Sequence, residues 1–252
     1  MKISGNRVLV TGGATGIGFE IARALIEKGN RVLVCGRREE KLREAQERVP
    51  ALETRVEDIG DEADRNALAD WAIERGMNVL VNNAGIQREI DLRRGVQPLL
   101  EGDDEIRVNF AAPVYLTALL TPYLMKQPNA AIVNVSSALG FIPLAILPVY
   151  CATKAAIHSF TVSLRHQLAE TGVRVFEVIP PTVDTGLDRG ARARRGQNFR
   201  GIPPAEVAAA VLQGMQEERT EIVVGAAARL VASARSDFAQ AFETMNARSR
   251  AS

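Results

Sequence analysis

Short apolar runs alternate with longer amphipathic segments along the whole chain. The runs are rich in Val, Ile and Leu, which is typical of parallel strands that are covered on both faces. The pattern predicts strands at Arg7–Thr11, Arg31–Cys35, 51–58, 78–85, Ala130–Ser137, Val173–Ile179 and 221–225. It predicts helices at Phe19–Gly29, Arg38–Val49, Asp61–Gly76, Asp103–Lys126, Pro148–Thr171 and 203–218. Strands that alternate with helices across short turns indicate an α/β fold, a Rossmann-type doubly wound parallel sheet of about seven strands with helices on both faces.

No linker and no short-period repeat interrupts this alternation, so we expect residues 1–252 to form a single domain. The tail carries a stripe of apolar residues at helical spacing, at Leu230, Ala234, Phe238, Phe242 and Met245. This stripe is expected to pack on its own domain or on another subunit, and a membrane-surface helix is the alternative.

The amino-acid composition and the net charge limit the kinds of partner that the protein is expected to bind. The chain has 46% hydrophobic and 24% charged residues, and 31 basic side chains nearly cancel 30 acidic ones. A field strong enough to hold nucleic acid or an anionic membrane is therefore not expected. No signal peptide and no transmembrane run is visible, and Cys35 and Cys151 do not form a disulfide framework. A cytoplasmic protein with reduced thiols is the prediction.

The first strand runs into a glycine-rich turn, TGGATGIG. Gly12 can make the sharp turn out of the strand, while Gly16 and Gly18 remove side chains where a phosphate approaches the backbone and where helix meets strand. The N-terminus of the following helix offers free N–H groups to a pyrophosphate. The turn therefore predicts a dinucleotide site, and a plain tight turn between strand and helix is the alternative.

Five motifs in order resemble the short-chain dehydrogenase/reductase family over nearly the whole chain. They are TGGATGIG, NNAG at 82–85, NVSS at 134–137, YCATK at 150–154 and IPPTVDT at 179–185. The residues around 137–159 and the EIVVGAAARL stretch are most similar to the DltE-like oxidoreductases of that family. The resemblance implies interconversion of a carbonyl and a secondary alcohol, and a homodimer or homotetramer built through the helices at Asp103–Lys126 and Pro148–Thr171.

Tyr150 and Lys154 are four residues apart on a predicted helix and so share one face. A neighbouring ammonium favours the phenolate, so we expect Lys154 to lower the pKa of Tyr150 and make it a general acid/base. Ser137, at the end of a central strand, is expected to orient the substrate oxygen, and Ser136 competes for that role. The resemblance adds Asn109 as a residue that holds a proton-relaying water. A Tyr-x-x-x-Lys pair alone is common by chance, but its place after the glycine turn argues against chance.

Arg37 suggests which dinucleotide binds. A carboxylate at this position would hold the ribose of NAD, whereas the guanidinium of Arg37 can fork onto the 2′-phosphate of NADP(H). The start of a solvated helix is the alternative. Relatives that prefer NADP often carry a basic residue where this chain has Thr15. The resemblance assigns further cofactor contacts to Thr15, Ile17, Asp58, Ile59, Asn83, Ala84, Gly85, Tyr150, Lys154, Pro180, Val183 and Thr185.

The substrate side is less well defined by the sequence. The apolar segment 138–149 is either core or a hydrophobic substrate wall, and Pro181 replaces a glycine usual in the family. We expect 182–201 to be a mobile substrate lid. Its arginines, at 189, 192, 194, 195 and 200, either recruit an anionic substrate or lie on a solvated loop. His158 and His166 are interpreted as structural, and no metal site is predicted.

The sequence as a whole thus predicts an NADP(H)-dependent oxidoreductase that acts on a small carbonyl or alcohol. The alternative is a non-catalytic NADP(H)-binding sensor or scaffold on the same fold.

Overall fold

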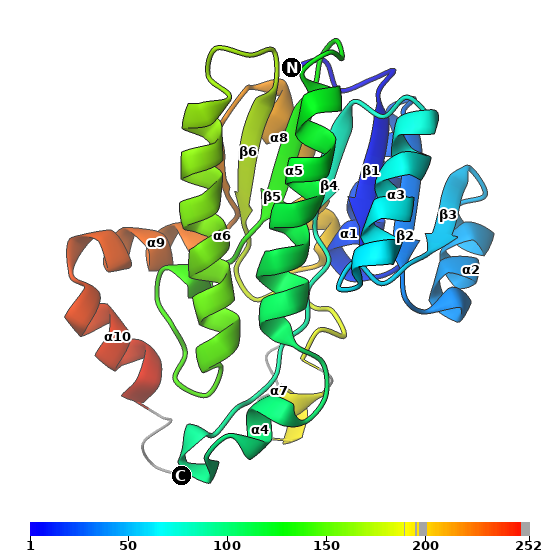
Figure 1. The fold of residues 1–252 in the computed structure, drawn as a ribbon. Coiled ribbons are helices and arrows are strands. Elements are labelled where there is room, and N and C mark those ends of the chain that lie inside the picture. Colours follow the sequence, from blue (N-terminus) through cyan, green and yellow to red (C-terminus); the bar gives the residue numbers. More distant parts are fainter. Residues whose placement is uncertain (189, 195, 197–200, 248–252) are drawn as a thin grey trace.

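Seven parallel strands form one twisted sheet at the centre of the protein (Figure 1). The computed structural model describes all residues except 189, 195, 197–200 and 248–252, and describes only the backbone of Arg192. The strands are β1 (Arg7–Thr11), β2 (Arg31–Gly36), β3 (Leu52–Val56), β4 (Val79–Asn82), β5 (Ala131–Val135), β6 (Arg174–Ile179) and β7 (Glu221–Val223). Their order is β3-β2-β1-β4-β5-β6-β7, and every neighbouring pair is parallel.

This order confirms the doubly wound sheet predicted from the sequence. The chain first builds outward from β1 to β3, then returns to the other side of β1 and builds outward again from β4 to β7. The direction therefore reverses between β1 and β4, and ligands of such sheets bind at this reversal, beyond the carboxyl ends of the strands.

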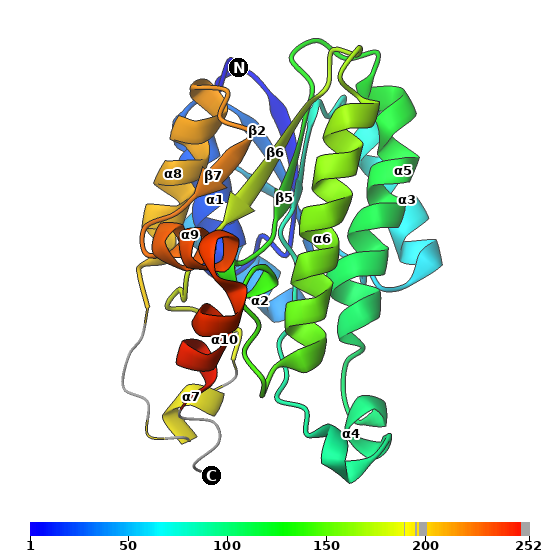
Figure 2. The same ribbon diagram turned by 90° about the vertical axis from the view of Figure 1, so that its left-hand side faces the viewer.

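Helices cover both faces of the sheet, and the alternation of side chains along each strand explains why (Figure 2). In β1, Val8 and Val10 pack in the core beneath α1 (Gly16–Glu27), α2 (Glu39–Arg48) and α8 (Pro204–Gln216). Leu9, between them, packs on the opposite face with α3 (Glu62–Glu74), α5 (Ala112–Leu124) and α6 (Pro148–Gln167). Successive residues of a strand point to opposite faces, so an uninterrupted apolar strand supplies two cores.

The helix predicted over Asp103–Lys126 begins later than expected. The polypeptide between β4 and α5 forms a loop with the short helices η1 (Leu92–Arg94) and α4 (Gln97–Leu100), then a π-helical turn η2 (Arg107–Ala111) that leads into α5. The Asp104 carboxylate accepts hydrogen bonds from the backbone N–H groups of Ile106 and Arg107, at 2.9 and 3.1 Å. This side-chain cap starts the helical segment after Asp104 and leaves Asp103 in the loop.

The tail forms two helices, α9 (Ala227–Ser236) and α10 (Phe238–Asn246), rather than one. Asp237 separates them with an extended backbone and caps α10 through Gln240 N. The apolar stripe of the tail is divided accordingly, because Leu230 and Met245 line the main cleft whereas Phe238 is exposed. Within the described part of the chain, no helix is long and apolar enough to cross a membrane.

Candidate active site

A single large cleft collects nearly all the residues that the sequence singled out. It has a volume of about 1270 Å³ and lies where β1, β4, β5 and β6 end. Three of the predicted catalytic residues line this cleft, namely Ser137, Tyr150 and Lys154. All of the predicted cofactor contacts except Gly18 line it as well. Asn109 and Gly18 lie behind the lining, where they hold it in place.

The glycine turn is hydrogen-bonded to the turn that follows β4. The Thr11 hydroxyl accepts hydrogen bonds from the backbone N–H groups of Asn83 and Ala84, at 3.0 and 3.1 Å. The Asn83 carboxamide donates to the backbone oxygens of Thr11 and Gly12. A Cβ on Gly12 would lie 2.8 Å from Ala84 Cα, and one on Gly18 would lie 2.6 Å from the Gly12 oxygen. These two glycines therefore permit a close backbone approach that no other residue could make.

The N-terminus of α1 is suited to an anionic group. Its N-cap residue, Thr15, has an extended backbone and makes no side-chain cap hydrogen bond, and the first turn of α1 contains no acidic residue. The first N–H groups of this helix are therefore not satisfied by side-chain caps, and the helix dipole favours a negative charge there. Gly16, with φ of 56°, faces the cleft beside Thr185. The turn fits the pyrophosphate of a dinucleotide.

Tyr150 and Ser137 form the polar centre of the cleft. Both side chains are nearly buried, with exposures of 5% and 6%, and the Ser137 hydroxyl is near enough to the Tyr150 phenol to oppose the rise in its pKa. Ser137 follows β5 and caps the short helix η3 (Ala138–Gly140) by accepting from Leu139 N at 3.1 Å. Tyr150 lies in the first turn of α6, which begins at Pro148. A hydroxyl pair at this position can hold and protonate one oxygen atom of a bound molecule.

Lys154 lies one helical turn after Tyr150, on the same side of α6. Its Nζ donates to the Val135 backbone oxygen at 2.9 Å and lies 5.7 Å from the centre of the Tyr150 ring. Burial lowers the pKa of Lys154 from 10.5 to about 8. The expected lowering of the Tyr150 pKa by Lys154 is not found in this arrangement. Burial raises the pKa of Tyr150, and the group that opposes this rise is Ser137.

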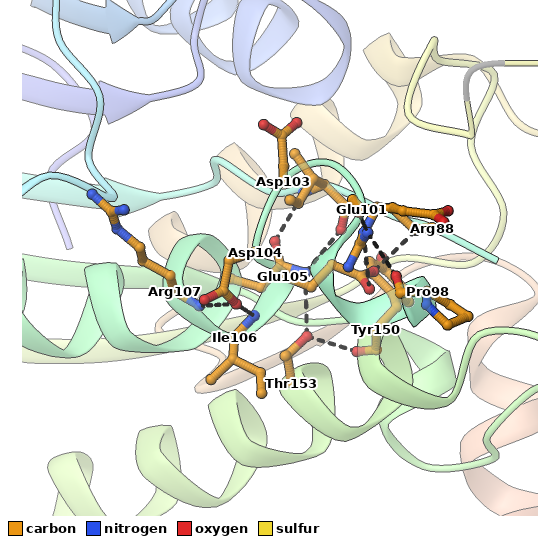
Figure 3. A network of polar contacts seen from close by, with 12 residues as sticks. Arg88, Pro98, Glu101, Asp103, Asp104, Glu105, Ile106, Arg107, Tyr150 and Thr153 are labelled. Carbon is orange, nitrogen blue, oxygen red and sulfur yellow. Dashed lines mark hydrogen bonds and ion pairs between the residues drawn. The ribbon is translucent and has the colours of Figure 1, made fainter. Parts of the chain in front are cut away.

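Asn109 clamps the loop after β4 to the catalytic helix. Its Oδ1 accepts from Ile86 N at 2.8 Å, and its Nδ2 donates to the Ile86 oxygen at 2.8 Å and to Thr153 Oγ1 at 3.2 Å. Thr153 Oγ1 in turn donates to the Tyr150 backbone oxygen at 2.7 Å (Figure 3). The carboxamide is thus fully engaged with the protein, and its contribution here is to fix the position of α6 relative to the loop.

Glu105 is a buried carboxylate that sequence reasoning missed. Its Oε1 accepts from Arg88 N at 3.0 Å, and its Oε2 lies 3.7 Å from Arg88 Nε. Arg88 also donates to the backbone oxygens of Pro98 and Glu101, so one guanidinium holds the loop together (Figure 3). Burial raises the pKa of Glu105, and its charge contributes to the raised pKa of Tyr150. The partner lies 17 residues earlier in the same connection between β4 and α5, so no helical or strand spacing indicates this pair.

Arg37 lies at the far end of the cleft, at the end of β2, where a ribose phosphate is expected. Its Nη1 and Nη2 donate to the two carboxylate oxygens of Asp103, at 3.0 and 3.2 Å. A carboxylate oxygen of Asp58 lies 3.8 Å from Nη1 and adds a second negative charge at this end of the cleft. Arg37 therefore points into the predicted position, but it is already held by a carboxylate from the loop before η2.

The substrate side of the cleft is apolar. Leu139, Leu144 and Leu147 line it from the segment before α6, while Leu230 and Met245 line it from the tail. Segment 138–149 thus serves in part as a cleft wall, which was one of two interpretations of its sequence. Pro181 lines the same wall.

The predicted lid, 182–201, contains the short helix α7 (Ala191–Arg194). Three of its arginines, at 189, 195 and 200, and the side chain of Arg192, lie outside the described residues. Arg194 and Arg88 line a separate cavity of about 220 Å³ together with Glu89 and Asp188. The described residues that line this cavity carry both signs of charge.

Ser136 and His158 belong to a second polar cluster, behind the catalytic pair. Ser136 Oγ donates to Glu177 Oε1 at 2.6 Å, and His158 Nδ1 lies 2.8 Å from Glu177 Oε2. Ser136 therefore faces away from Tyr150, as the alternation along the strand requires. Glu221 lies close enough that atoms of His158, Glu177 and Glu221 fall within 4.8 Å of one another. Arg235 already pairs with Glu221, so hydrogen bonds and an ion pair account for this cluster.

The comparisons with known proteins agree with this geometry. Residues 6–196 match the short chain dehydrogenase family, and the chain belongs to the short-chain dehydrogenase/reductase family of nucleotide-binding oxidoreductases. It is 50% identical over 248 residues to DltE, an uncharacterized oxidoreductase of Bacillus subtilis (strain 168). The aligned region covers 98% of each of the two chains. The predicted family and subgroup are thereby confirmed.

Solved structures show the same fold. A short chain dehydrogenase from Burkholderia cenocepacia J2315 in complex with NADP is 28% identical, with a TM-score of 0.80 over 97% of this chain and 98% of that one. A short chain dehydrogenase/reductase from Burkholderia phymatum in complex with NAD is 22% identical, with a TM-score of 0.84 over 98% and 97%. Both dinucleotides thus occur on this fold.

Proposed function

We propose that this protein is an NADP(H)-dependent oxidoreductase that interconverts a carbonyl and a secondary alcohol, with Tyr150 as the general acid/base. The observation that carries the proposal is that Tyr150 and Ser137 lie together, nearly buried, beside Lys154 in the same cleft as the glycine turn. The relative solved with NADP supports the choice of cofactor.

The residues that would hold the cofactor line the cleft from end to end. The N-terminus of α1 would hold the pyrophosphate, Asp58 and Ile59 the adenine, and Arg37 the 2′-phosphate. Lys154 would hold the nicotinamide ribose, and Thr185 the carboxamide. When bound, the nicotinamide supplies or accepts the hydride.

The chain's own residues handle the oxygen and its proton. Ser137 Oγ and Tyr150 Oη hold the substrate oxygen between them, and Tyr150 donates its proton as the carbonyl becomes an alcohol. The raised pKa of Tyr150 keeps it protonated and so ready to donate in the reductive direction. The Ser137 hydroxyl, the group that opposes the rise in the Tyr150 pKa, would donate to the phenolate that remains. The apolar walls of Leu139, Leu144 and Leu147 favour a carbonyl with an apolar substituent.

Assembly into a homodimer or homotetramer fits the exposed apolar residues of α5 and α6. Tyr115, Leu119 and Val162 are exposed by 58%, 42% and 45%, respectively. Large apolar side chains on long helices are typical of surfaces that pack against another subunit.

The test offers a panel of carbonyls, from apolar ketones to keto acids, with NADPH and in parallel with NADH. We expect turnover with NADPH on apolar ketones. Tyr150→Phe should reduce turnover by about a hundredfold or more and leave the Kd for NADPH unchanged. Tyr115→Phe, which removes an exposed hydroxyl, is the matched control.

The alternative function, a non-catalytic sensor, predicts a different outcome. It requires tight NADPH binding with no turnover on any member of the panel, and an equal Kd for the wild type and both variants. Turnover that survives Tyr150→Phe would instead refute the assignment of the general acid.

A further inference from the structure

The arginine expected to recognise a 2′-phosphate is already bound to a carboxylate of its own chain. The two Nη atoms of Arg37 meet the two oxygens of Asp103 at 3.0 and 3.2 Å, in a bidentate arrangement. Arg37 and Asp103 come from two segments far apart in the sequence, the end of β2 and the loop before η2. Because carboxylates and phosphates both bind the N–H edge of a guanidinium, Asp103 takes the Nη1–Nη2 edge that could otherwise bind a phosphate.

We propose that Asp103 is a specificity-determining residue, which competes with the 2′-phosphate of NADP(H) for Arg37 and so limits the preference for NADP(H) over NAD(H). The inference rests on the proposed function, in which Arg37 binds that phosphate. A cofactor without the phosphate leaves the Arg37–Asp103 pair intact. A cofactor with the phosphate must displace the carboxylate or share the guanidinium with it.

The surroundings of Arg37 determine the direction of the effect. The 2′-phosphate would meet two carboxylates, Asp103 on the guanidinium and Asp58 at 3.8 Å from Nη1. Arg38 and Lys41 line the same end of the cleft and provide positive charge, although Lys41 is paired with Glu44 at 2.7 Å. Neutralising Asp103 removes both the competitor for the guanidinium and a like charge next to the phosphate. It should therefore tighten the binding of NADP(H) and leave that of NAD(H) unchanged.

The size of the effect follows from the exposure of the pair. The side chains of Arg37 and Asp103 are exposed by 39% and 28%, so solvent screens their attraction. Removal of the Asp103 charge breaks an exposed ion pair of this kind and also removes its repulsion of the phosphate. Together these two effects should change the Kd of NADP(H) by about three- to tenfold.

The test measures the Kd of NADPH and of NADH, by the fluorescence of the reduced nicotinamide, for the wild type and for Asp103→Asn. Asparagine keeps the shape of the side chain and removes its charge. We expect the Kd of NADPH to fall about three- to tenfold and that of NADH to stay constant. Glu101→Gln is the matched control, because it removes the same charge from the same loop at a side chain that faces Arg94, not Arg37. It should change neither Kd.

Arg37→Ala and the double variant separate the inference from the proposed function. If Arg37→Ala leaves the Kd of NADPH unchanged, the assignment of Arg37 to the phosphate fails, and the inference fails with it. If Arg37→Ala weakens NADPH binding but Asp103→Asn has no effect, or weakens it as well, only the inference is refuted. In the Arg37→Ala background, Asp103→Asn should lose most of its effect. Asp103→Ala provides a second substitution, and thermal unfolding of each variant verifies the fold.

Discussion

Lys154 carries a predicted conflict between catalysis and stability. Its ammonium is buried at the end of the cleft, and the burial lowers its pKa from 10.5 to about 8. Below that pKa the folded protein holds a buried charge that the unfolded chain would expose to water. A shift of this size corresponds to roughly 3 kcal/mol of destabilisation at neutral pH. Lys154→Met removes this cost, and it should raise the free energy of unfolding at pH 7 while abolishing turnover.

The pH dependence tests the cause. Between pH 8 and 10.5 the folded protein has released the Lys154 proton, whereas the unfolded chain still holds it. Unfolding therefore takes up a proton in this range, and the free energy of unfolding of the wild type rises with pH. The Met variant has no such group. Its advantage should be full below pH 8 and should disappear as the pH approaches 10.5.

Urea denaturation of the two proteins at a fixed protein concentration, from pH 7 to 10.5, measures this difference directly. Other groups titrate over the same range, but they are common to both proteins and cancel in the difference. Lys126→Met, at an exposed position, is the matched control, and its difference from the wild type should stay constant. The loss of the hydrogen bond to the Val135 oxygen reduces the gain of the variant by a similar amount at every pH.

Parallel curves for the wild type and Lys154→Met between pH 8 and 10.5 would refute the reasoning. They would show that the ammonium is solvated in the folded protein. The Lys154 side chain would then not be buried against β5 as described.

Two further predictions concern residues around the cleft. Ser136→Ala should lower the free energy of unfolding by about 1–3 kcal/mol in urea denaturation, because the buried Glu177 carboxylate loses a donor. Ser137→Ala should lower the free energy of unfolding by less than Ser136→Ala does, but it should reduce turnover. If the two substitutions have equal effects on stability and on turnover, the opposite orientations described for the two side chains are contradicted. Asn246→Ala should raise the KM for a bulky apolar ketone roughly several-fold, with the Kd of NADPH unchanged, because its carboxamide anchors Ala145 N at 2.7 Å. A uniform loss of cofactor affinity would refute that local role.

The sheet could be predicted because its signal is local. Most of the strands are apolar runs of their own, and the side-chain alternation within Arg7–Thr11 suffices to supply both cores. The first residue of the helical segment that leads into α5 could not be predicted as accurately, because a single capping side chain, Asp104, determines where this segment begins. Helical periodicity extends through such a cap without marking it.

That the candidate catalytic residues lie close together was also predictable, because their spacing along one helix and one strand end is fixed by the backbone. Their electrostatics were not. The pKa of Tyr150 depends on its burial and on Glu105, and the sequence gives no sign that this carboxylate is buried near it. Likewise, the Arg37–Asp103 pair joins residues that are far apart in the sequence, and His158 on α6 meets Glu177 on β6. Such contacts depend on tertiary packing, which a pattern along the chain does not encode.

The two ends of the cleft are therefore built differently. At the catalytic end, α6 docks on β5 through consecutive contacts, Tyr150 with Ser137 and Lys154 with the Val135 oxygen, all nearly buried. Packing of this kind would hold the geometry that the proposed proton transfer needs, and we expect substitutions there to reduce turnover. At the adenosine end, Arg37 is a partly exposed side chain that is held by an ion pair with Asp103. Cofactor preference can therefore change through a single charge, such as that of Asp103, without disturbing the catalytic pair.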